Sequence, residues 1–69
     1  MTAQQIQETV DSLEAMVDTS DLSTVVDALA EVCFMKADHI RTNWQDLGTA
    51  RPWEVVANKL VRVRNSLDI

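Results

Sequence analysis

Residues 22–47, LSTVVDALAEVCFMKADHIRTNWQDL, carry the longest continuous helical pattern in the chain. Apolar residues recur there at the 3.6-residue spacing of an α-helix. This apolar face consists of Leu22, Val25, Val26, Leu29, Val32, Cys33, Ile40, Trp44 and Leu47. Ser20 or Asp21 suits the N-cap, and Gly48 suits the left-handed position after the last turn. The pattern predicts a single helix roughly 39 Å long.

A shorter helical pattern precedes this stretch, over residues 3–17. Thr2 is the expected N-cap, with Gln5 as its reciprocal partner in a capping box. Its narrow apolar stripe consists of Ile6, Val10, Leu13 and Val17. A stripe with so few large members predicts a helix on the outside of the fold.

A third helical pattern follows, from residue 50 or 51 to residue 67. Thr49 is the expected cap, and Pro52 falls in the first turn, where its missing N–H costs no hydrogen bond. The apolar stripe consists of Trp53, Val56, Leu60, Val63 and Leu67, with Ala57 beside it. Trp44 and Trp53 are expected to meet across the Gly48 turn.

No stretch alternates apolar and polar residues as a strand would, so an all-α fold is predicted. Residues 1–69 are expected to form one domain, a short–long–medium antiparallel three-helix bundle. The first helix should fold back along residues 22–33, and the third along residues 32–47. Because both are shorter than the middle helix, apolar surface would stay uncovered in one copy. A homodimer is predicted to cover it.

Composition narrows the function classes. A chain of 69 residues is marginally stable and usually needs a disulfide, a metal or oligomerisation. Cys33 is the only cysteine and His39 the only histidine, so neither an internal disulfide nor a structural zinc site is expected. The free thiol, and the absence of a signal-peptide pattern or a long apolar run, favour a cytoplasmic protein without cofactors.

Charge is divided unevenly along the chain. Residues 1–35 contain seven acidic residues and no Lys or Arg, whereas residues 36–69 contain six basic and four acidic residues. The net charge of −5 argues against direct binding to nucleic acid or to anionic membranes. The basic residues Arg51, Lys59, Arg62 and Arg64 are expected to pair with acids of the first helix, within the chain or across a dimer.

The acidic residues form two ridges at helical spacing. Glu8, Asp11, Glu14 and Asp18 follow one flank of the first helix, and Asp27, Glu31 and Asp38 follow the polar side of the second. Carboxylates one helical turn apart, at about 5–6 Å, resemble the phosphate spacing of a nucleic-acid strand. The ridges therefore fit either a decoy for a nucleic-acid-binding protein or a solvated face that keeps the protein soluble.

Phe34 and Met35 lie off the main apolar stripe of the second helix, and Phe34 falls within its acidic ridge. They fit either a packing contact, within the chain or across a dimer, or an anchor for another protein. Val55 and Val61 are off-stripe in the same way. Lys36 projects from the apolar face, where a lysine lays its stem on the core and its ammonium group in water, or pairs with an acid.

One polar flank could be mistaken for an active site. It consists of Lys36, His39, Asn43 and Asp46. No Ser or Cys stands at a helical spacing that would pair it with His39, and no glycine-rich loop is present to hold phosphate. The flank is interpreted as a hydrogen-bonding network, and no enzymatic activity is predicted.

These observations predict a helical protein that binds and regulates another protein, as a homodimer. The alternative is an acidic inhibitor that blocks a nucleic-acid-binding protein by imitating nucleic acid. The residues predicted to contact the partner are Glu8, Asp11, Glu14, Asp18, Asp27, Glu31, Phe34, Met35 and Asp38.

Overall fold

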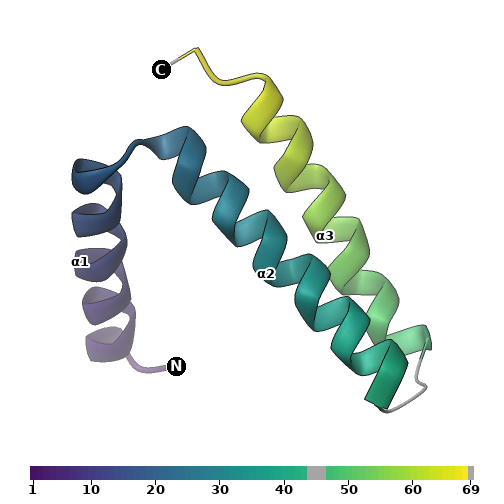
Figure 1. The fold of residues 1–69 in the computed structure, drawn as a ribbon. Coiled ribbons are helices and arrows are strands. Elements are labelled where there is room, and N and C mark those ends of the chain that lie inside the picture. The colour runs from purple at the N-terminus through teal and green to yellow at the C-terminus, as the bar shows by residue number, and fades with distance from the viewer. Residues whose placement is uncertain (44–46, 69) are drawn as a thin grey trace.

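The computed structural model describes residues 1–43 and 47–68. It contains three helices, α1 (Ala3–Thr19), α2 (Leu22–Asn43) and α3 (Leu47–Asn65), and no strand among the residues described. The predicted all-helical fold with three helices is confirmed. In Figure 1, α3 runs back beside α2, whereas α1 and α2 separate from each other away from the turn that joins them.

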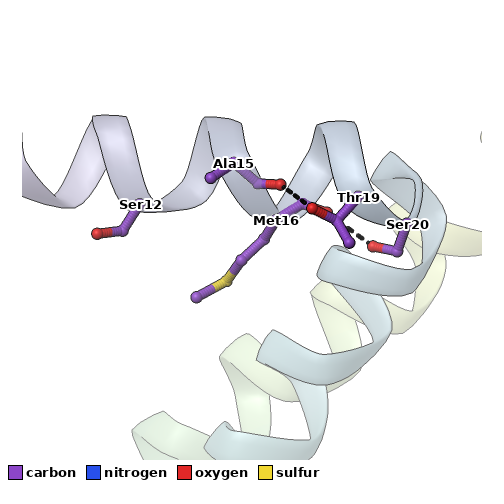
Figure 2. A pocket seen from close by; sticks show the side chains of 5 residues that line it. All are labelled: Ser12, Ala15, Met16, Thr19 and Ser20. Atoms are coloured by element: carbon purple, nitrogen blue, oxygen red, sulfur yellow. Dashed lines mark hydrogen bonds between the residues drawn. The ribbon is translucent and has the colours of Figure 1, made fainter.

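Both ends of α1 are held by local hydrogen bonds. The Gln5 N–H donates to Thr2 Oγ1 over 3.1 Å, and the Thr2 N–H donates to Gln5 Oε1 over 2.7 Å, which confirms the predicted capping box. At the other end, the hydroxyl groups of Thr19 and Ser20 donate to the carbonyls of Ala15 and Met16 (Figure 2). The capping box satisfies N–H groups at the start of the helix that have no carbonyl partner within it.

Asp21 caps the start of α2. Its Oδ1 accepts the Thr24 N–H over 2.6 Å, so Asp21 is the N-cap of the two candidates that the sequence offered. Hydrogen bonds from the backbone and then the side chain of Thr24 lower the pKa of the Asp21 carboxyl. A carboxylate beside the positive end of a helix is stabilised further by the helix dipole.

This cap predicts an acid-sensitive contribution to stability. Because the Asp21 pKa is lower in the folded chain, its contribution is present above the ordinary aspartate pKa of about 3.9 and is lost as pH falls below it. We expect Asp21→Asn, which still caps, to reduce the acid-induced fall in the free energy of unfolding. Urea titrations between neutral and acidic pH test this, with Asp21→Ala destabilised at neutral pH as the reference. An unchanged acid dependence in Asp21→Asn would contradict it.

The boundary between α2 and α3 differs from the prediction. The structure ends α2 at Asn43, and it includes Gly48 and Thr49 in the first turn of α3, so Gly48 does not terminate α2 and Thr49 does not cap α3. Glycine takes helical as readily as left-handed backbone angles, so sequence alone does not choose between them. Pro52 lies inside α3 and cannot donate to the Gly48 carbonyl. Trp44 and Asp46, and so the predicted meeting of the two tryptophans, lie outside the described residues.

Small side chains form the seam between α2 and α3. The buried residues are Ala30, Cys33 and Ala37 on α2 and Ala50 and Ala57 on α3. Their spacing of three, four or seven residues keeps each set on one face of its helix. Because these side chains are short, the two helix backbones can approach closely along the seam.

Ion pairs join the two sides of this seam near both of its ends. Arg41 pairs with Glu54, and Arg64 Nε lies 3.1 Å from Asp27 Oδ2. The second pair places the end of α3 beside the first turns of α2. The contact predicted for the third helix, along residues 32–47, is therefore too short, because the observed contact reaches back to Asp27.

The large apolar residues lie beside the seam and not in it. Leu29 is 48% exposed and Val32 is 47% exposed, and Trp53, Val56 and Val63 on α3 are also exposed. Leu22, Val25, Val26 and Ile40 are half-buried, as are Leu60 and Leu67. Apart from Cys33, the predicted apolar stripes thus lie beside the packed face, which consists of alanine and cysteine.

The three helices form a single layer. Its principal extents are 38 × 31 × 15 Å, and the smallest is little more than the 10–12 Å diameter of one helix. The radius of gyration is 13.9 Å, against about 11 Å for a compact chain of this length. Stable domains usually bury a core between two layers of secondary structure, and one copy of this chain supplies only one.

Candidate protein-binding surfaces

An apolar groove lies where α1 and α2 diverge. Its volume is about 330 Å³. Leu13 and Met16 line it from α1, Ser20 from the turn, and Thr24, Val25, Ala28, Leu29 and Val32 from α2. Figure 2 shows Met16 projecting from α1 into the angle between the two helices. The groove has apolar walls and only short hydroxyl side chains at its closed end.

The same face of α2 continues past the groove toward the end of the helix. Val32, Met35, Lys36 and His39 line a second hollow there. Met35 is 60% exposed. Lys36 is exposed and forms no ion pair with any described residue. This region therefore combines an apolar surface with a positive charge that pairs with no acid in the described parts of the chain.

The α1 ridge, defined as Glu8, Asp11, Glu14 and Asp18, is exposed. Gln4 Nε2 donates to Glu8 over 3.4 Å, and Gln7 Nε2 donates to Asp11 over 2.9 Å. Neither ion pair found among the described residues includes a carboxylate of this ridge. The four negative charges are left without a cationic partner in the described parts of the chain.

The α2 ridge, defined as Asp27, Glu31 and Asp38, lies on a different face of α2 from the groove. Asp27 is partly neutralised by Arg64, whereas Glu31 and Asp38 are exposed and form no ion pair among the described residues. Phe34 stands between Glu31 and Asp38, one helical turn from each, and is 37% exposed. The result is an accessible aromatic ring flanked by carboxylates.

The predicted pairing of α3 bases with α1 acids does not occur among the described residues of one copy. Arg64 pairs with α2, and Arg51, Lys59 and Arg62 are exposed and have no ion pair there. The physical reason is placement, because α3 packs along α2 while α1 diverges from it (Figure 1). Val55 is exposed on α3, and Val61 is half-buried.

The remaining features offer little chemistry. The hollow formed by Ser12, Ala15, Met16, Thr19 and Ser20 lies on the surface of α1, and the hydroxyls of Thr19 and Ser20 are already bonded to backbone carbonyls (Figure 2). His39 and Asn43 are exposed. Within residues 1–43 and 47–68, no group of three potential metal ligands is found, and no helix is long and apolar enough to cross a membrane.

Comparisons of the chain with protein-family models, with curated proteins and with solved structures each gave no match.

Sequence reasoning missed the groove. It placed Leu13, Val25, Leu29 and Val32 in apolar stripes but assigned no role to Met16 or Ala28. The missed signal is a second apolar face on α2, formed by Val25, Ala28, Leu29 and Val32. If the alanine and cysteine positions of α2 form the face that packs against α3, the second apolar face of α2 is free for another contact.

Proposed function

We propose that the chain is a small non-enzymatic helical protein that binds and regulates another protein, and that two copies complete its antiparallel bundle. The observation that supports this proposal is that small side chains are buried and large apolar side chains are exposed, which is the reverse of an ordinary core. Alanine and cysteine are buried, while Leu29, Val32 and Met35 are exposed. Large exposed apolar surfaces in small proteins are typical of sites that another protein covers.

The two exposed faces of α2 suit two different contacts. The groove face is broad and apolar, which suits a second copy. Phe34, between Glu31 and Asp38, suits the other protein. An aromatic anchor surrounded by charged residues is the usual composition of an interface centre and its rim. The matching surface on the partner would be an apolar pocket with basic residues around it.

Substitution at the Phe34 face tests partner binding. Immobilised protein is incubated with extract of the native cells, and the captured proteins are identified by mass spectrometry. We expect Phe34→Ala to lose a specific partner, with at least a tenfold fall in affinity of the purified pair, because a central aromatic anchor dominates binding energy. Val55→Ala, at an exposed valine of α3, is the matched control. Capture of the same partner by Phe34→Ala and by Val55→Ala at the wild-type level would contradict the proposal.

The acidic α1 ridge supports a second candidate function. Its four carboxylates have no cationic partner in the described chain, as expected for a surface that imitates the phosphates of nucleic acid. An inhibitor of this kind would bind a nucleic-acid-binding protein in its basic groove. Its affinity would fall steeply with added salt, because the charges involved are exposed.

Neutralising the α1 ridge separates the two functions. A variant with Glu8→Gln, Asp11→Asn, Glu14→Gln and Asp18→Asn keeps the helix and removes four charges. Loss of partner binding in this variant, together with strong salt dependence, would favour the acidic inhibitor. Retained, salt-tolerant binding that depends on Phe34 would favour the apolar interface.

A further inference from the structure

One copy of the chain exposes more surface than a compact protein of its size. The accessible surface is 5482 Å². A folded monomer of 7.7 kDa exposes about 4,300 Å². The difference, about 1,200 Å², exceeds the roughly 800 Å² that each partner buries in a standard protein interface. The area is therefore sufficient for a stable contact with a second copy.

The groove between α1 and α2 is the part of this surface best shaped for a helix. It is open along its length, apolar on both walls, and continues over Val32 and Met35. Its occupant needs an apolar stripe at helical spacing. The first half of α1 supplies one, because Ile6 and Val10 are 51% and 47% exposed and lie outside the groove of their own chain.

Charge favours the same occupant. The α1 ridge is negative. Among the described residues it has no cationic partner, and Lys36, at the end of the groove face, has no carboxylate partner. Glu14 is the ridge member closest to the apolar stripe, being four residues after Val10 and three before Val17. An α1 helix whose stripe entered the groove would carry Glu14 along its edge.

We propose that two copies associate about a two-fold axis so that α1 of each copy lies in the α1–α2 groove of the other, with Glu14 beside the partner's Lys36. A two-fold axis perpendicular to α1 makes the two α1 helices antiparallel. α1 and α2 of one copy run in opposite senses and separate away from the turn (Figure 1), so the incoming α1 runs in the same sense as α2. Its first half then meets Val25 and Leu29, and its second half reaches Met35 and Lys36. This inference rests on the dimer that forms part of the proposed function.

Substitutions at residues that are exposed in a single copy test whether α1 enters the groove of the partner. Ile6→Glu and Val10→Glu change exposed residues, so helicity measured by circular dichroism should stay at the wild-type value at protein concentrations where the dimer still forms. We expect each to raise the dimer dissociation constant at least about tenfold in sedimentation equilibrium. Val55→Glu, at a 42% exposed valine on α3, is the matched control and should dimerise like the wild type.

A charge exchange tests the orientation of the two helices. Glu14→Lys and Lys36→Glu should each weaken the dimer, on the order of fivefold for a partly exposed pair, and the double variant should recover most of the loss. Wild-type affinity in both Ile6→Glu and Val10→Glu, or a double variant weaker than either single one, would overturn the arrangement. A dimer that survives these variants leaves the proposed function standing, whereas a monomeric wild type removes the dimer from it. Partner capture through Phe34 is tested separately.

Discussion

Replacing Ala57 with leucine is expected to lower the free energy of unfolding by about 1–3 kcal/mol, a large part of the stability of a chain this small. Ala57 has no exposed surface and lies on the α3 side of the α2–α3 seam. A leucine there would force apart two helices that approach closely only because their facing side chains are small. Urea unfolding followed by circular dichroism measures the loss.

The same substitution at an exposed alanine provides the control. Ala15 lies on the surface of α1, and Ala15→Leu should change the free energy of unfolding by no more than about 0.5 kcal/mol. Equal stability of the Ala15 and Ala57 variants would show that α2 and α3 do not pack through their alanines.

The melting temperature is expected to fall by about 5 °C for each tenfold dilution of the protein. The reason is mass action, because unfolding of a dimer releases two chains and is favoured at low concentration. The magnitude follows from the typical entropy of unfolding per residue, applied to two chains of 69 residues. Calorimetry or circular dichroism over a hundredfold range of concentration measures it.

The Val10→Glu variant is the internal control for this concentration dependence. If α1 enters the partner's groove, the variant should melt at a lower temperature that varies little with concentration. A wild-type melting temperature independent of concentration would contradict association coupled to folding.

Much of the local structure could be predicted from the sequence. Thr2 and Gln5 form a capping box, and Asp21 caps α2, because short polar side chains before an apolar pattern have few other local roles. The three-helix fold followed from apolar spacing alone. These features depend on residues within one turn of each other, which the sequence specifies directly.

The choice of packed face could not be predicted in the same way. The prediction gave the core to large residues such as Leu29 and Val56. Among the described residues the buried positions are Ala30, Cys33, Ala37, Ala50 and Ala57, and of these only Cys33 belonged to a predicted stripe. Hydrophobic burial favours large side chains, whereas close helix packing favours small ones, and α2 carries both patterns on different faces. Which face meets α3 depends on the geometry of both helices together.

Which surfaces are free to bind a partner also depends on which face of α2 packs against α3. The acidic ridges and the off-stripe position of Phe34 are visible in the sequence. The absence of α1–α3 ion pairs among the described residues is not, because it results from the divergence of α1 from α2 (Figure 1). The groove is likewise a consequence of that divergence.

The central claim is that one layer of three helices needs a second copy to cover its apolar face. The molecular mass in solution tests this claim most directly. Sedimentation equilibrium at micromolar concentration should give twice the 7.7 kDa mass of the chain. A stable, fully helical species with the mass of one chain under the same conditions would contradict the account.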